Sequence, residues 1–149
     1  MQKDQNKLLI MREDHNLISR YMNAFRKIKC SDAKTIQLLW ERLRNAIIID
    51  NNLFPRDVAR LNSTLIVKNL ETNLAVAYTI VLPRDVDRRK NKVSILSPIG
   101  IALIGLKKGL CFNWERLARK KNFAVLEIYN SPSLERSHRK AYQSKFLSY

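Results

Sequence analysis

The sequence contains little of what disulfide frameworks and membrane spans are built from. It has only three glycines, four prolines and two cysteines among 149 residues. Because Cys30 and Cys111 are too few for a disulfide framework, free thiols in a reducing compartment are expected. No uninterrupted apolar segment approaches the ~20 residues that span a bilayer, and the polar segment 1–7 is not the pattern of a secretory signal. We therefore expect a cytoplasmic protein without membrane contact.

Patterns for catalysis and metal binding are also scarce. His15 and His138 are far apart in the chain, and neither has a ligand-like neighbour. There is no glycine-rich phosphate loop and no nucleophile elbow. The acidic pair Glu13 and Asp14 is interpreted as charge at the start of a helix. The sequence therefore predicts no metal, no cofactor and no complete active site, so the protein is not expected to be an enzyme.

Acidic residues are few, and the basic excess is concentrated in the C-terminal half. The chain has 28 Lys and Arg against 13 Asp and Glu, a formal net charge of +15. The candidate basic patch consists of Arg88, Arg89, Lys90, Lys107, Lys108, Arg119, Lys120 and Lys121. A field of this sign favours nucleic acid or an acidic protein surface as partner. A solvated basic face is the alternative, and the exposed charge favours a monomer.

Two apolar stripes predict an N-terminal pair of helices. The first stripe comprises Leu17, Ile18, Tyr21, Met22 and Phe25, and the second comprises Ile36, Leu39, Trp40, Leu43, Ala46 and Ile47. Ser31 or Asp32 could cap the second helix. A short connection predicts an antiparallel helical hairpin over residues 1–50. Within this region, the segment 8–11 is either a short strand or the lead into the first helix.

A β-rich region follows the turn-rich linker 50–57. The expected strands are 63–69, 74–82, 93–96, 111–114 and 122–129, and the nearly continuous apolar run 74–82 predicts an interior strand. Together with one short helix they predict an α+β domain over residues 51–130. Residues 131–149 are predicted to be a basic C-terminal tail.

The stretch 93–114 contains all three glycines of the chain and organises this domain. Ser97 is placed to cap a short helix, and Pro98 suits its first position, where no N–H is needed. Gly109 permits a turn with positive φ before the next strand. The pattern predicts a buried strand, helix, turn and strand, and the periodicity alone does not say what the unit is for.

The stretch 93–109 resembles the signature of the C-terminal domain of the GreA/GreB transcription elongation factors. The segments 54–58, 61–63 and 67–70 are similar to those of the Rnk type, a small Gre-like protein. The resemblance implies a short N-terminal antiparallel helical hairpin, followed by an FKBP-like antiparallel β-sheet domain with one short helix.

The same resemblance implies a partner. Gre-type C-terminal domains dock at the rim of the secondary channel of bacterial RNA polymerase, and the helical hairpin points into that channel. Carried over by position, Ser97 and Pro98 are the candidate docking residues, because the family places its Ser-Pro there. Gly100, Gly105 and Gly109 carry over as residues that the fold requires.

Two departures from the cleavage factors shape the functional prediction. Those factors carry an acidic pair at the hairpin tip that helps to hold a catalytic magnesium ion. The tip residues here are Lys29, Cys30, Ser31 and Asp32, so there is one carboxylate, amid four cations within 26–34. Leu96 stands where those factors have an Asp before the Ser-Pro. We therefore expect a polymerase-binding regulator of the Rnk type that does not stimulate transcript cleavage.

Two other functions remain open at the level of sequence. The basic clusters could bind RNA or DNA directly, with an affinity that falls steeply with salt. An FKBP-like fold also suggests a prolyl isomerase, although a fold does not imply a function and the sequence shows no aromatic-lined pocket.

Overall fold

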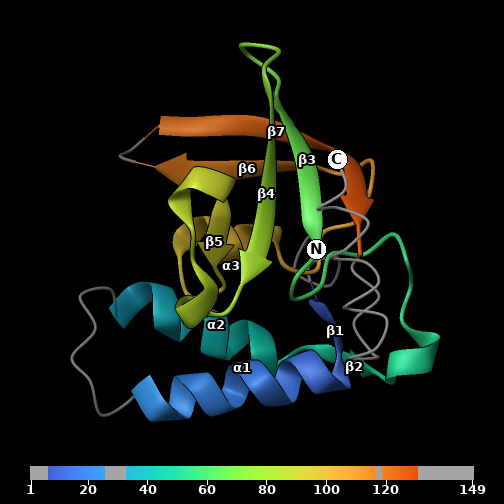
Figure 1. Cartoon of the computed structure of the whole chain (residues 1–149), viewed down its shortest axis with the longest axis vertical. Coiled ribbons are helices and arrows are strands. Elements are labelled where there is room, and N and C mark those ends of the chain that lie inside the picture. The colour runs from blue at the N-terminus through green and yellow to red at the C-terminus, as the bar shows by residue number, and fades with distance from the viewer. Residues whose placement is uncertain (1–6, 26–32, 117–118, 131–149) are drawn as a thin grey trace.

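A computed structural model describes residues 7–25, 33–116 and 119–130, and Figure 1 shows how the elements are arranged. The helices and strands are β1 (Leu9–Met11), α1 (Arg12–Phe25), α2 (Ala33–Arg44), β2 (Ile47–Ile49), β3 (Thr64–Asn69), β4 (Ala75–Val81), β5 (Lys92–Ser94), α3 (Pro98–Leu103), β6 (Cys111–Arg116) and β7 (Arg119–Tyr129). Three 3-10 turns are η2 (Asn51–Leu53), η3 (Pro83–Asp85) and η4 (Arg88–Lys90). This mixture of sheet and helices confirms the predicted α+β class.

Five strands form one sheet in the order β5-β4-β3-β7-β6. β3 pairs antiparallel with both β4 and β7, and β6 pairs antiparallel with β7. β5 instead runs parallel to β4, so the prediction of an antiparallel sheet is wrong for this edge strand. The physical reason is the connection: the chain crosses over through η3 and η4 before it returns, and a crossover of this kind allows parallel pairing.

The neighbouring strands β3 and β4 differ in how fully they are buried. In β3, Leu65 and Val67 are buried on one face, as the alternation predicted. In β4 only the last two residues, Ile80 and Val81, are buried. β4 lies between β3 and β5, so the prediction of an interior strand is confirmed at this end of β4. Leu74 and Val76 near its start are 68% and 37% exposed, so the prediction is wrong at the other end. β5 pairs only with the last three residues of β4, and Figure 1 shows the β3–β4 hairpin projecting beyond the rest of the sheet.

The predicted helical hairpin is confirmed in its two arms. Ile18 and Met22 of α1 and Leu39 and Leu43 of α2 are buried, as their stripes required. The two arms are antiparallel, because the His15 ring near the start of α1 lies 3.3 Å from the Leu43 carbonyl oxygen near the end of α2. With 14 and 12 residues, the arms are ~21 and ~18 Å long.

Two short strands close the hairpin at its base. β1 pairs in parallel with β2, with Leu9 opposite Ile47, which decides between the alternatives for 8–11 in favour of a strand. Ile47 was expected on the second helical stripe and is instead a strand residue with 47% of its surface exposed. The helix ends at Arg44 because the Ile47 N–H donates to the Leu8 carbonyl, 2.8 Å away, rather than to the preceding turn of helix.

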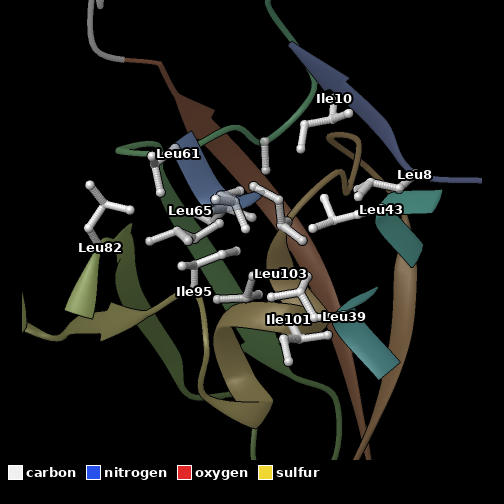
Figure 2. Packing of buried hydrophobic residues seen from close by; sticks show 14 of the residues in the cluster. Leu8, Ile10, Leu39, Leu43, Leu61, Leu65, Leu82, Ile95, Ile101 and Leu103 are labelled. Atoms are coloured by element: carbon white, nitrogen blue, oxygen red, sulfur yellow. The ribbon is translucent and has the colours of Figure 1, made fainter. Parts of the chain in front are cut away.

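One hydrophobic core joins the hairpin to the sheet. Figure 2 shows residues from β1, α2, β3 and α3, together with Ile95 directly after β5, pointing into the same space. Its fully buried members include Ile10, Ile18, Met22, Leu39, Leu61, Leu65, Ile80, Ile95, Leu103 and Ile104. The helical arms therefore pack directly against the domain that carries the Ser-Pro turn. The boundaries at residues 50 and 130 stay a prediction, and the segment 131–149 lies outside the described residues.

Candidate functional site

The Ser97–Pro98 turn is built by hydrogen bonds between β5 and α3. The Ser97 hydroxyl donates to the Ser94 carbonyl oxygen at 2.6 Å and accepts from the Gly100 N–H at 3.1 Å. The second bond satisfies one of the free N–H groups at the start of α3, so the predicted N-cap is confirmed. Ser97 is half-buried, and its hydroxyl both donates and accepts a hydrogen bond that shapes the turn.

Pro98 is the exposed member of this pair. It opens α3, where its missing N–H leaves no donor unsatisfied and its ring fixes φ near the helical value. Its side chain is exposed to solvent. The turn therefore presents a rigid apolar ring to solvent, while the Ser97 hydroxyl bonds to the backbone on either side of it.

The glycines of this region are required for two different reasons. A Cβ on Gly100 would lie 2.0 Å from the Ser94 carbonyl oxygen, so only glycine lets α3 approach β5 this closely. Gly105 and Gly109 adopt φ of +78° and +87°, which other residues rarely do. The expectation that all three are fold residues agrees with these positions.

Leu96 occupies the position at which the resemblance led us to expect an Asp. It is half-buried and packs against the hydrophobic core. Its N–H donates to the Ser94 hydroxyl at 3.0 Å. The position before Ser97 therefore carries an apolar side chain in place of the expected carboxylate.

Arg42 contacts the far end of α3 and was not singled out from the sequence. Its Nη1 donates to the carbonyl oxygen of Ile101. Burial lowers the pKa of the Arg42 guanidinium, although a guanidinium stays charged in proteins. A sequence signal did exist, since Arg42 lies three residues after Leu39 and so borders the buried stripe of α2.

Asp14 was interpreted as charge at a helix start, and the structure gives it a larger role. Its carboxylate accepts from the Arg60 guanidinium at 3.2 Å and from the Leu61 N–H at 3.0 Å. Desolvation raises the pKa of Asp14, and Arg60 and the Leu61 N–H offset part of that rise. This pair links the first turn of α1 to the segment that precedes β3. Residues 46 positions apart cannot be paired from local pattern.

The candidate basic residues lie on three separate elements. Arg88, Arg89 and Lys90 form η4 and are exposed, and the Asp87 carboxylate accepts from the Arg89 N–H at 3.0 Å. For these three cations no ion pair is found within residues 7–25, 33–116 and 119–130. This exposed basic turn, η4, therefore presents its charge to solvent.

The charge of the second basic cluster is partly balanced. Lys107 Nζ lies 3.7 Å from the Asp57 carboxylate, and Lys108 Nζ lies 2.7 Å from that of Glu127. The hydrogen bond to Glu127 raises the pKa of Lys108. These lysines contribute less to a positive field than the sequence suggested, because each faces a carboxylate.

The remaining candidates are placed only in part. Arg119, Lys120 and Lys121 begin β7, where their backbones pair with Arg116, Glu115 and Trp114 of β6. The hairpin-tip residues lie outside the described residues; they are Lys29, Cys30, Ser31 and Asp32. Cys111 is exposed and carries a free thiol, as expected.

Neither a metal-binding cluster nor a membrane-spanning helix is found in the part of the chain that the structure describes. There, no three His, Cys, Asp or Glu side chains gather closely enough to hold a metal ion. None of the described helices combines the length and the apolar content needed to cross a bilayer.

Comparison with known proteins places this site in a family context. Residues 55–130 match the family described as "Transcription elongation factor, GreA/GreB, C-term". Transcription elongation factor GreA from Clostridium botulinum strain Hall is 38% identical over 91 residues, which are 61% of this chain and 56% of that protein. GreA from Clostridium botulinum strain Eklund 17B is 33% identical over 91 residues, which again are 61% of this chain and 56% of that protein. This chain thus spans about half the length of the curated relatives it matches.

A solved structure supports the likeness over a larger part of this chain. The GreA/GreB-type prokaryotic transcription elongation factor from Nitrosomonas europaea superposes with a TM-score of 0.71 and is 25% identical. The superposition covers 83% of this chain and 100% of that one. The family match spans 55–130, slightly more than half of the chain, and it includes the capped Ser97–Pro98 turn and all three glycines. The chain therefore belongs to the GreA/GreB transcription elongation factor family.

Proposed function

We propose that this protein is a transcription regulator that binds bacterial RNA polymerase through the Ser97–Pro98 turn, at the rim of the secondary channel. The observation that carries the proposal is the exposed Pro98 ring on a turn fixed by the Ser97 cap, inside the family-matched segment 55–130. A rigid apolar anchor is suited to recognition, because little conformational freedom is lost when it binds. The proposal assigns no cofactor and no catalytic residue to this chain.

We further propose that binding does not stimulate transcript cleavage, as in the Rnk type. The described arms of the hairpin, α1 and α2, are only 14 and 12 residues long. The tip sequence has Asp32 as its single carboxylate. The resemblance to the cleavage factors implies that an acidic pair at the tip helps to hold the catalytic magnesium ion, and this chain lacks such a pair. The protein would then occupy the channel rim and exclude other factors that dock there.

A cleavage assay on a backtracked elongation complex tests this second step. The protein alone is expected to leave the cleavage rate at its basal value, with a GreA protein as the positive control. Added before GreA, it should suppress the GreA-stimulated rate in a dose-dependent manner. Stimulation of cleavage by the protein alone would contradict the proposal, and so would the absence of any effect on GreA at concentrations that saturate polymerase.

Direct binding of nucleic acid is the second candidate function, and the exposed turn η4 favours it. Arg88, Arg89 and Lys90 lie together there, and no ion pair to them is found within the described residues. If they contact phosphates, changing all three to Gln should reduce the salt dependence of RNA binding by about 2–3 in slope. Binding of RNA alone that is weak and unchanged in this variant would leave polymerase as the partner.

A further inference from the structure

The last turn of α3 depends on another helix for one of its hydrogen bonds. The Gly100 carbonyl of α3 accepts from the N–H of Ile104, directly after the helix, at 3.1 Å, and the Leu103 carbonyl accepts from the Leu106 N–H at 3.2 Å. The Ile101 carbonyl lies between them on a residue that is only 3% exposed. Its partner is Arg42 of α2. A buried carbonyl that loses its donor destabilises the element that carries it.

Packing holds the two helices together around this contact. Figure 2 shows Leu39 of α2 beside Ile101 and Leu103 of α3, and all three are buried in the common core. Next to Ile101, Gly100 lies against the Ser94 backbone so closely that a Cβ has no room. α3 is therefore a short helix held against the β5 backbone on one side, through Ser97 and Gly100, and against α2 on another, through Ile101.

The position of Pro98 follows from these two attachments. α3 has only six residues, from Pro98 to Leu103, so a tilt at Ile101 would displace Pro98 as well. Packing by Leu39 resists separation of the helices but sets no direction, because apolar contacts are not directional. The guanidinium supplies the directional contact, since its donors lie in a fixed planar arrangement.

We propose that Arg42 is a positioning residue that orients the Ser97–Pro98 turn for docking and couples that turn to the helical hairpin. The inference rests on the proposed function, because it assumes that Pro98 contacts the polymerase. Arg42 itself needs no contact with the partner. Arg42 acts through α3. It links the helical arm α2, which under the proposed function belongs to the hairpin that points into the secondary channel, to the Ser97–Pro98 turn that binds the channel rim.

The test compares three variants of the full chain for binding to core polymerase. Arg42→Met keeps an unbranched apolar stem and removes the donors, so the dissociation constant should rise about tenfold, the size expected from a lost buried hydrogen bond. Arg42→Lys keeps the charge and rotatable N–H donors but lacks the planar arrangement of the guanidinium, so it should restore only part of the affinity. Arg44→Met, an exposed arginine on the same helix, is the matched control and should bind like the parent protein.

A double variant separates positioning from general stability. In the Pro98→Ala background, Arg42→Met should add little further loss of polymerase affinity, because the residue through which it acts is gone. Its effect on the urea midpoint should be the same in both backgrounds. Fully additive losses of affinity would overturn the proposal, as would an Arg42→Met protein that folds and binds like the parent.

Amide hydrogen exchange provides a readout that does not need the polymerase. The Ile104 N–H, bonded to the Gly100 carbonyl, should exchange faster in Arg42→Met than in Arg44→Met, because the end of α3 is loosened. Unchanged exchange would overturn the positioning role. If exchange accelerates while the parent protein binds no polymerase, the proposed function and the docking role both fail, and only the structural link between α2 and α3 stands.

Discussion

The Asp14 carboxylate and the Arg60 guanidinium lie 3.2 Å apart inside the protein, with side-chain exposures of 3% and 7%. The pair joins α1 to the segment before β3, and the Leu61 N–H completes the site. Burial of two charges opposes folding, and their attraction offsets that penalty only where the geometry is good. The pair therefore fixes how the hairpin sits on the sheet more than it adds to stability.

Removing only one member of this pair should be strongly destabilising. Asp14→Leu leaves the Arg60 charge facing an apolar group and the Leu61 N–H without its acceptor, and we expect a loss of about 3–5 kcal/mol in the free energy of unfolding. The double variant Asp14→Leu with Arg60→Met should lose less than Asp14→Leu alone. Urea unfolding measures both. Asp50→Leu, which removes the exposed Arg12–Asp50 pair, is the control and should cost less than about 1 kcal/mol.

The same pair predicts a pH dependence with a definite sign. Because burial raises the pKa of Asp14 above its ordinary 3.8, the folded protein keeps this proton at pH values where the unfolded chain has released it. The contribution of Asp14 to the free energy of unfolding should then fall as the pH rises from about 4 through the raised pKa. Unfolding of the parent and of Asp14→Asn across this range measures it. A parent protein that gains stability over the variant as pH rises would show that Arg60 outweighs burial.

The Ser97 hydroxyl should stabilise the Ser97–Pro98 turn measurably. Ser97→Ala removes both the bond to Ser94 and the cap on Gly100, and caps of this kind contribute about 1 kcal/mol. Ser97→Thr keeps a hydroxyl and should recover most of the loss. Urea unfolding gives the stability, and polymerase binding should follow the same order. Equal stability of the Ala and Thr variants would show that the hydroxyl is not what holds the turn.

Gly100→Ala should move the Ser97–Pro98 turn, whereas Gly109→Ala should not. The new Cβ at Gly100 meets the Ser94 carbonyl oxygen at 2.0 Å, and backbone atoms must shift to admit it. At Gly109 the added Cβ enters open space, and the change costs only the strain of φ +87°, about 1–2 kcal/mol. Polymerase affinity should fall in the first variant and hold in the second. A polymerase affinity that falls in Gly109→Ala and holds in Gly100→Ala would contradict docking through the Ser97–Pro98 turn.

Local sequence pattern correctly predicted those elements whose formation depends on residues close together in the chain. The helix α1, the strand β3 and the Ser97–Pro98 cap follow from apolar spacing, alternation and a serine before a proline, each within a few residues. The parallel ribbon of β1 and β2 did not follow, because its pairing of Leu9 with Ile47 joins distant segments. Ile47, which continues the spacing of the second apolar stripe, was therefore assigned to the second helix rather than to β2.

The candidate site shows the same limit. Pro98 and the three glycines could be chosen from the sequence, since a helix start and tight turns restrict which residues fit. Arg42 could not be assigned a role, because its acceptor is a backbone carbonyl 59 positions away. The charges of Lys107 and Lys108 were overestimated for the same reason, as their carboxylate partners come from other elements.

Equilibrium binding of the full chain to core RNA polymerase, with Pro98→Ala beside the parent, tests the central claim most directly. Pro83→Ala is the matched control, because Pro83 likewise opens a helical turn, η3. The account predicts that the parent and Pro83→Ala bind equally and that Pro98→Ala binds at least about tenfold more weakly, a loss of ~1.4 kcal/mol. A folded parent that does not bind polymerase, or a Pro98→Ala variant that binds as tightly as the parent, would contradict it.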